Sequence, residues 1–578
     1  MLRQAKSWTD LADLKHVALA LVSVLGFLGA PTCLSAIPAD QAAGPRFEVS
    51  FPPSVHRGAV TGRLFVLISH RGNPEPRLQS LWFNSPEIIA VDVSRLESGE
   101  RAIVDSSALG TPLASLHDLE AGDYYVQAVL NVYTQVHRAD GHVLWAHLDQ
   151  GEGQQFNKSP GNLYSKVARL HLDGSRNLQL SLTEVMPPIL PEADTEWIKH
   201  LRLQSKLLTR FWGRPIYLGA VILLPRDYHS DSNRQYPVIY YQPEHFRSFP
   251  PFEFTTDPTP EDPALSRERQ MEGIESGYEF YRAWASDGFP QLIAVSLQTP
   301  TPLSDWSGAI DSDNTGPYAQ AIMTELIPAI EEQFRIIRST YARVVTGKDS
   351  GGRAALALQL QHADFFGGAW IFHPWPFNFE HWSSLNIYDN QNAFRVKATD
   401  LQALSTIAEW LPIERMVART AADVPLVTLR QLSRHDAVMA GMAAGDPIGA
   451  DDAINGPVGP DGRPKRLWDR KTGAIDRKVA EHWRQHGDLA YYARTHWTHI
   501  GPHLLGKLHF YVGDRDEFYR AEGVRSFEKF LKTTQDPHYE GTFVYGTFKG
   551  SWQPMTNAEL VKAMAAHIAQ NAPKSGQP

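Results

Sequence analysis

Short apolar runs separated by turn residues fill the first part of the chain after its N-terminal segment. Examples are 62–69, 123–133 and 178–182, in which β-branched and aromatic residues recur between Gly, Pro, Asp and Asn. The stretch Ala139-Asp-Gly-His142 carries the Asp-Gly signal of a hairpin turn. This pattern predicts an antiparallel β-sandwich domain over residues 46–185.

The pattern changes after the prolines at 187, 188 and 191, which mark a linker. Helical spacing is expected over 197–211 and 319–334. Continuous apolar runs predict buried strands at 216–224, 236–241, 291–296 and 343–346. Strands that alternate with helices predict a mostly parallel sheet covered on both faces, in an α/β domain over 195–572.

The second half of this domain has a less regular part and a regular end. Gly- and Pro-rich stretches near 400–470 predict an insertion over the carboxyl edge of the sheet. Apolar runs at 506–512 and 541–545 predict the last two strands, and 557–571 predicts a closing helix.

Composition and charge exclude some classes of partner. Of the 578 residues 43% are hydrophobic and 21% charged, which is ordinary for a folded soluble protein. A net charge of -9 offers no basic surface for nucleic acid or for an anionic membrane. We expect no cofactor and no metal, and a small-molecule or carbohydrate ester as the substrate or ligand.

The N-terminus has the order of an export signal. Basic residues precede an apolar run at 17–28, and small residues follow around Ala36. We therefore expect a signal peptide over residues 1–36 and a periplasmic or secreted protein, with no stable membrane span after cleavage. An uncleaved anchor and lipidation of Cys33, the single cysteine, are the alternatives.

The stretch from Val344 to Leu358 carries the candidate chemistry. It reads as a strand, a glycine-rich turn and a helix, which is the context of a nucleophile elbow. Residues two before and two after the nucleophile must be small, and Gly347 and Gly351 satisfy this around Asp349. Placing the nucleophile at Ser350 puts Lys348 at a position that resists bulk. The alternatives are a phosphate-binding turn and a plain strand-to-helix connection.

The chain resembles a family of bacterial secreted esterases in the enterochelin-esterase-like branch of α/β hydrolases. This resemblance implies an α/β-hydrolase fold and, in the family pattern, a serine esterase site. The blocks that carry it fall in order along the mature chain: Asp123–Ala128, Ser159–Ser165, Tyr236–Tyr241, Gly316–Tyr318, Ala321–Pro328, Ala355–Gln359, Asp364–Gly367, Asn386–Tyr388, Gly456–Gly459 and Val512–Asp514.

The same comparison reveals two departures. Members of the resembled family carry Gly-x-Ser-x-Gly-Gly at the elbow. In this chain Asp349 stands at the position of that serine, and Ser350, Gly351 and Gly352 follow it. They carry a histidine just before a tryptophan after the last strand, where this chain reads Phe548-Lys-Gly-Ser-Trp-Gln-Pro554. The resemblance implies that Asp514 or Asp516 is the acid of the site.

Other residues are candidates to complete the site. His373 follows the strand after the elbow helix and is our first choice for a relocated base. His245 and Phe246 lie in the loop that forms the oxyanion hole in this fold, and we expect them to line the pocket. Asp349 with Glu244, an acid and a histidine is a weaker alternative as a metal site.

Three functions remain open at this stage. The first is a hydrolase of ester or related carbon–oxygen bonds with a remodelled site, in which Asp349 attacks carbon directly. The second is a pseudoenzyme that binds a carbohydrate or peptide without turnover. The third is an interaction protein that acts through its β-rich domain.

Overall fold

The structure is a computed structural model of the 578-residue chain. It describes residues 44–82, 85–147, 155–174, 177–244, 250–259, 266, 269, 273–396, 413–440, 448–539 and 541–573. The predicted signal peptide at 1–36, Cys33, His245 and Phe246 lie outside the described residues. Residues 44–578 form one compact unit, so the predicted boundary between two domains stays a prediction.

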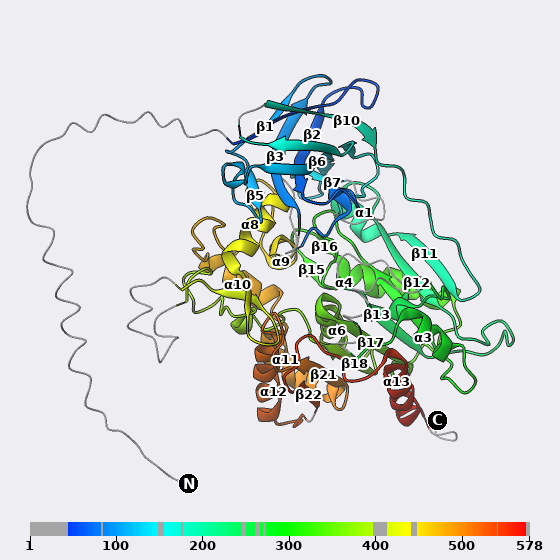
Figure 1. The fold of residues 1–578 in the computed structure, drawn as a ribbon. Helices are drawn as coiled ribbons and strands as arrows, with labels where there is room; N and C mark the ends of the chain where they lie inside the picture. The colour runs from blue at the N-terminus through cyan, green and yellow to red at the C-terminus, as the bar shows by residue number, and fades with distance from the viewer. Residues whose placement is uncertain are drawn as a thin grey trace, which may run out of the picture. The chain divides into compact units, whose positions relative to one another are not determined.

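A ten-stranded sheet forms the N-terminal part, drawn in blue and cyan in Figure 1. Its strand order is β4-β1-β10-β8-β6-β2-β3-β5, and β7 and β9 pair with β6. The strands are β1 (Arg46–Ser50), β2 (Val60–Ser69), β3 (Glu87–Leu96), β4 (Ala102–Val104), β5 (Leu109–Thr111), β6 (Gly122–His137), β7 (Val143–His147), β8 (Leu163–Ser165), β9 (Ala168–Leu172) and β10 (Asn177–Val185).

This sheet corrects two details of the predicted antiparallel sandwich. The strands form one continuous sheet, because β10 pairs with β1 through 177–181 and with β8 through 182–185, with a register shift between Leu182 and Glu184. Strand β1 also runs parallel to β10. Strand β10 passes from one layer to the other at this register shift, so a single sheet folds over on itself. The core that it encloses includes Phe47, Leu64 and Leu182.

A second, eight-stranded sheet carries the elbow. Its order is β11-β12-β14-β13-β17-β18-β21-β22, in which β14 through β22 run parallel and β11 and β12 antiparallel at one edge. When the eight strands are numbered 1 to 8 by their order in the sequence, their order across the sheet is 1-2-4-3-5-6-7-8. This is the strand order of the α/β-hydrolase fold. The strands are β11 (Ile198–Gln204), β12 (Tyr217–Leu223), β13 (Val238–Gln242), β14 (Ile293–Gln298), β17 (Arg343–Lys348), β18 (Gly368–Phe372), β21 (Leu508–Gly513) and β22 (Thr542–Gly546).

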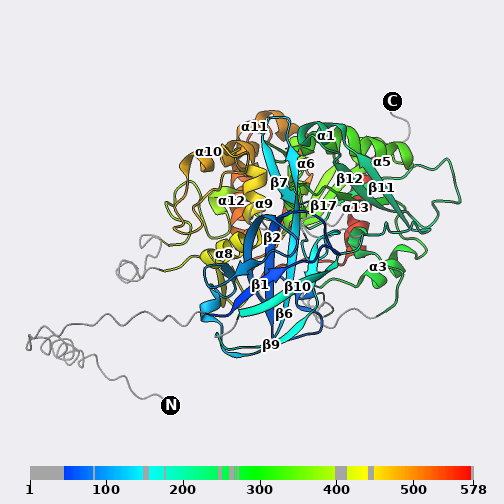
Figure 2. The ribbon, with the colours of Figure 1, turned by 90° about the horizontal axis from the view of Figure 1, so that it is seen from above.

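Helices pack on both faces of this sheet, and Figures 1 and 2 show their course. Side chains of α3 and α13 share one core with the sheet, and side chains of α6, α11 and α12 share the other. The helices are α1 (Lys206–Trp212), α3 (Gly277–Trp284), α4 (Tyr318–Ala321), α5 (Ile327–Gln333), α6 (Asp349–Gln361), α8 (Leu429–Ala440), α9 (Ile448–Asn455), α10 (Arg477–His486), α11 (Leu489–Leu504), α12 (Arg520–Thr533) and α13 (Asn557–Asn571).

The helix predicted over 197–211 is wrong in its first half. Residues Ile198–Gln204 form the edge strand β11, in register with β12, and α1 begins only at Lys206. The apolar spacing of this segment fits a helix, but pairing with the sheet overrides it. The Ser205 hydroxyl accepts a hydrogen bond from the Leu208 amide and so caps the helix after the strand ends.

The predicted insertion near 400–470 contains regular structure in its described parts. These include α8, α9 and a hairpin of β19 (Met416–Arg419) and β20 (Pro425–Thr428). Residues 397–412 and 441–447 lie outside the description. Helix α8 packs against β3 and β5 of the first sheet (Figure 1). The insertion therefore connects the two sheets.

Candidate functional site

The elbow forms where strand β17 meets helix α6. Asp349 has φ +50°, a strained left-handed conformation for a residue that is not glycine. A Cβ on Gly347 would lie 2.3 Å from the Gly351 carbonyl oxygen, and a Cβ on Gly351 would lie 2.1 Å from the Gln242 carbonyl oxygen. Both positions therefore require glycine, and they bracket Asp349 as a tight elbow does.

The neighbouring residues of the turn are buried. A Cβ on Gly352 would lie 2.9 Å from the Phe372 carbonyl oxygen, so this glycine lets α6 approach β18 closely. Ser350 is 0% exposed, whereas the Asp349 side chain keeps 20% of its surface. The structure therefore presents Asp349, and not Ser350, at the tip of the turn.

Arg520, at the start of α12, joins the elbow to the acid loop. Its Nη1 donates to Asp349 Oδ2, and its Nε donates to Asp516 Oδ1 at 2.8 Å. Its Nη2 donates to Ser551 Oγ at 2.6 Å, and Ser551 Oγ donates to a Glu517 carboxylate oxygen at 2.7 Å. Arg520 and Asp516 have almost no exposed side-chain surface. A buried chain of charged hydrogen bonds thus spans the site.

Arg520 stands where a serine triad needs a histidine. Burial lowers the pKa of Arg520, but the carboxylates of Asp516 and Asp349 outweigh burial and raise its pKa above the ordinary value. A guanidinium that stays charged has no lone pair to accept a proton, so Arg520 is not a general base. Ser551, at the position where the resembled family has histidine, contacts Arg520 instead of replacing that function.

The two candidate acids have different roles. Asp516 Oδ1 accepts hydrogen bonds from the backbone amides of Phe518 and Arg520, both at 3.0 Å, in addition to the Arg520 side chain. Asp514 Oδ1 instead accepts from the Phe548 amide at 2.7 Å. Asp516 therefore belongs to the chain that reaches Asp349, and Asp514 ties together the loops that follow β21 and β22.

His373 lies at the carboxyl end of β18, close to the elbow but not bonded to it. Its backbone amide donates to the Tyr511 carbonyl at 2.7 Å, and the Trp375 amide donates to the Asp349 carbonyl at 2.8 Å. Burial first, and then the positive charges of Arg520 and Lys348, hold the pKa of His373 well below its ordinary value. Within the described residues, neither His373 Nδ1 nor Asp349 Oδ1 has a hydrogen-bond partner.

Sequence reasoning missed Arg520, Glu517 and Ser551 as members of the site. A signal was present, because a carboxylate at a mostly buried turn requires a cation. The charged stretch Asp514-Arg-Asp-Glu517 through Arg520 supplies one after β21. Which of its arginines turns inward depends on the direction of α12, and the sequence pattern does not specify that direction.

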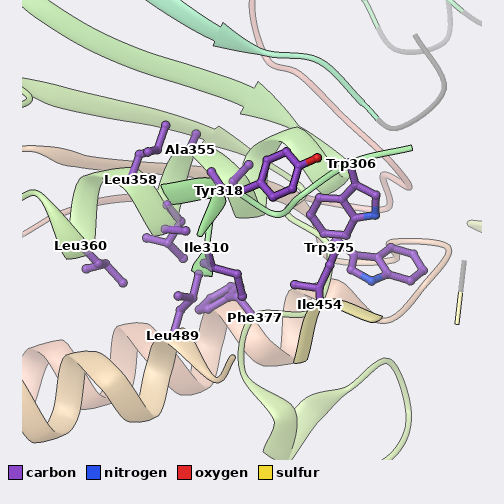
Figure 3. Packing of buried hydrophobic residues seen from close by; sticks show 14 of the residues in the cluster. Trp306, Ile310, Tyr318, Ala355, Leu358, Leu360, Trp375, Phe377, Ile454 and Leu489 are labelled. Atoms are coloured by element: carbon purple, nitrogen blue, oxygen red, sulfur yellow. The ribbon is translucent and has the colours of Figure 1, made fainter. Parts of the chain in front are cut away.

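The insertion holds the elbow helix in place. Arg353 on α6 donates to Asp451 Oδ1 at 3.1 Å and to Asn455 Oδ1 at 2.7 Å, both on α9. Asp451 Oδ2 also accepts from the indole nitrogens of Trp375 and Trp382. Figure 3 shows the apolar packing beside this network, where Ala355 and Leu358 lie near Tyr318, and Leu489 lies beside Phe377.

A Ser-His-Asn chain of hydrogen bonds occurs elsewhere, in the first sheet. Ser159 Oγ lies 3.0 Å from His147 Nε2, and His147 Nδ1 lies 2.9 Å from Asn131 Oδ1. These distances suit a catalytic triad, but Ser159 is 0% exposed and a substrate cannot reach it. We interpret this chain as a buried polar network that fixes β6, β7 and the following segment.

The described residues contain no group of three or more His, Cys, Asp or Glu side chains arranged to hold a metal ion. In the same residues, none of the helices combines the length and the apolar character that crossing a membrane requires. The metal alternative around Asp349 therefore gains no support from these residues.

Comparisons with known proteins give distant structural matches. Neither a family model nor a curated protein matches the chain. A ferulic acid esterase is 12% identical with a TM-score of 0.34, over 64% of this chain and 97% of that one. An S-formylglutathione hydrolase from Agrobacterium tumefaciens is 12% identical with a TM-score of 0.32, over 65% and 96% of the two chains. The fluorophosphonate-binding serine hydrolase FphF from Staphylococcus aureus is 12% identical with a TM-score of 0.32, over 64% and 98%.

These matches are too distant to assign a family or an activity to this chain. By their own descriptions these three structures are an esterase, a hydrolase and a serine hydrolase.

Proposed function

We propose that this protein has the α/β-hydrolase fold without serine-esterase chemistry, and that it binds a small ligand without turning it over. The observation that carries this proposal is Arg520, which pairs with Asp349 on one side and with Asp516 on the other. The acid and the elbow residue are thus held apart by a group that cannot accept a proton.

Each step of a serine esterase lacks its group at this elbow. The nucleophile position holds a carboxylate, and the position of the imidazole is filled by a guanidinium. Attack by a hydroxyl requires a base to take its proton, and release of an acyl group requires a base to activate water. The ion pair with Arg520 also lowers the nucleophilicity of Asp349, because attack on carbon must break a charge-assisted hydrogen bond.

Hydrolysis of p-nitrophenyl acetate and butyrate by the purified full chain tests this proposal. The parent and the Asp349→Asn and Ser350→Ala variants are measured beside buffer. We expect all three proteins to give the buffer rate. Turnover by the parent that disappears in Asp349→Asn, at a protein concentration that excludes a contaminant, would show that the elbow is catalytic.

A hydrolase with Asp349 as nucleophile is the second candidate. Its support is the Asp349 Oδ1 atom, which has no partner among the described residues, at a strained elbow. In such an enzyme Asp349 attacks the substrate carbon and either expels halide or opens the epoxide C–O bond, whose alkoxide takes a proton from water. Water then attacks the carboxyl carbon of the resulting ester, which releases the alcohol and regenerates the Asp349 carboxylate. One turnover in H₂¹⁸O of an epoxide or haloalkane probe would place ¹⁸O in the peptide that contains Asp349. Its absence after prolonged incubation excludes this route for those probes.

Export is part of the proposed function. The basic residues and the apolar run at 17–28 support a signal peptide that ends near Ala36. Cell fractionation followed by N-terminal sequencing of the mature protein tests this. A mature chain that begins at Met1 in the cytoplasm would contradict export.

A further inference from the structure

A cavity of about 720 Å³ lies beside the start of α12, separate from the elbow network. Its walls come from the turn around η7 (Phe379–His381) and the residues that follow it, from the start of β19, and from Tyr519 and Glu522. Arg520 lies between the last two residues in sequence, and its buried side chain is directed to Asp349. The cavity therefore shares α12 with the elbow without including the elbow residues.

The charges of the cavity are balanced. Four carboxylates line it, from Glu380, Asp389, Glu414 and Glu522. Arginines pair with three of them, at 3.1 Å from Arg494 to Glu380, 2.9 Å from Arg430 to Glu414 and 4.0 Å from Arg525 to Glu522. A fourth arginine, Arg415, lines the cavity and brings the number of positive charges level with the four carboxylates. Neither an anion nor a cation is favoured by such a lining.

The lining combines hydrogen-bonding groups with the apolar side chains of Leu385, Val396, Ile413 and Met416. Arg415 donates hydrogen bonds through Nη1 to the Ser384 carbonyl and through Nη2 to the Arg395 carbonyl. Asn390 Oδ1 accepts a hydrogen bond from the Asn386 backbone amide, and Asn390 Nδ2 has no acceptor among the described residues. Burial lowers the pKa of His381, so its imidazole is neutral near pH 7 and offers one donor and one acceptor.

We propose that this cavity binds a neutral, hydroxyl-rich ligand of mono- or disaccharide size. Each sugar hydroxyl donates to a carboxylate oxygen and accepts from an amide or imidazole N–H, which is the mixture that the lining supplies. The volume lies within the range of small-molecule sites. The inference rests on the proposed non-hydrolytic function and names the class of ligand that would be bound.

Titration calorimetry with neutral sugars tests the proposal on the full chain. The probes are glucose, galactose, xylose, maltose and cellobiose, with glucuronate and glucosamine as charged analogues. Glu522→Gln and Asn390→Ala change the cavity. Lys529→Gln is the matched control, because Lys529 is an exposed charged residue of α12 outside the cavity. Thermal unfolding confirms that each variant is folded.

We expect at least one neutral sugar to bind, with affinity at least tenfold weaker in both cavity variants and unchanged in Lys529→Gln. Tighter binding of a charged analogue, an equal effect of Lys529→Gln, or no binding by any neutral probe would overturn the inference. Ester hydrolysis is a separate measurement, so a failure of the proposed function is distinguishable from a failure of this site.

Discussion

At the scale of single residues, Arg520 decides what the elbow does. It contacts Asp349, Asp516 and Ser551 with three different nitrogens while its side chain is 1% exposed. A buried cation that satisfies two carboxylates cannot be removed without leaving both of them unpaired. The same residue thus stabilises the fold and withholds the base that catalysis requires.

Replacing Arg520 by methionine keeps an unbranched apolar stem but shortens the side chain and removes its charge. We expect a loss of about 3–5 kcal/mol in the free energy of unfolding, because Asp516 and Asp349 then lack their buried partner. Urea denaturation measures this loss. Arg525→Met on the same helix is the control, and its exposed pair with Glu522 predicts a change of at most about 1 kcal/mol. Equal effects of the two variants would contradict a special role of Arg520.

His435 gives a prediction about pH. It is 7% exposed against the edge of Trp82, and burial, opposed by Asp436, lowers its pKa to about 4. The unfolded chain therefore takes up a proton near pH 6.5 before the folded chain does. The resulting stabilisation is complete above pH 6.5 and is lost as pH falls through 4. Between pH 6.5 and pH 4, His435 alone lowers the free energy of unfolding by about 3 kcal/mol.

In His435→Gln, the decrease in the free energy of unfolding between pH 7 and pH 4 should be smaller by that amount. Urea denaturation at a series of pH values measures the decrease. His499→Gln, which changes an exposed histidine of α11, is the control for loss of a histidine. An unchanged slope in His435→Gln would show that His435 does not titrate as its burial implies.

At the scale of elements, the tight turn between β17 and α6 was the part best predicted from sequence. The glycine spacing around Asp349 is a local property, and it led to the residue that has φ +50° in the structure. The edge strand β11 was not predictable in this way, because its apolar spacing suits a helix and only pairing with β12 makes it a strand. The partners of Asp349 come from residues about 170 positions away, and no local pattern gives their orientation.

Gly351→Ala tests the elbow turn. The added methyl group would lie 2.1 Å from the Gln242 carbonyl oxygen, which is backbone and cannot move away cheaply. We expect a loss of more than about 2 kcal/mol, since the clash must displace β13 or α6. Gly523→Ala in α12 is the control, because its nearest neighbour would be at 3.8 Å and alanine favours a helix by about 1 kcal/mol. A neutral Gly351→Ala would mean that the turn is less tight than described.

At the scale of the whole molecule, long-range arginine contacts join the first sheet to the insertion. Arg63 on β2 donates through Nε to the Val438 carbonyl at 2.7 Å and through Nη2 to the Ala437 carbonyl at 3.0 Å. Arg434 on α8 donates to the Pro112 carbonyl at 2.6 Å. Because α9 of the same insertion holds the elbow helix through Arg353, the first sheet supports the site indirectly.

Arg63→Met should loosen α8. Two carbonyls at the C-terminal end of this helix lose a charged donor, at a cost of about 1–3 kcal/mol. Hydrogen exchange followed by mass spectrometry should show faster exchange in Leu429–Ala440 than in the parent. Arg101→Met, which removes a half-exposed ion pair with Glu48, should leave α8 unchanged. Equal exchange in α8 of the Arg63→Met variant would show that the contact contributes little.

The hydrolysis of p-nitrophenyl acetate by Asp349→Ser tests the central claim most directly. This variant restores the hydroxyl nucleophile of the resembled family and leaves Arg520, Asp516 and Ser551 as they are. Our account predicts the buffer rate, because Arg520, which still stands between residue 349 and Asp516, has no lone pair to take the proton of the serine. A rate clearly above buffer that disappears in Asp349→Ala would show that a working base is present and would contradict the account.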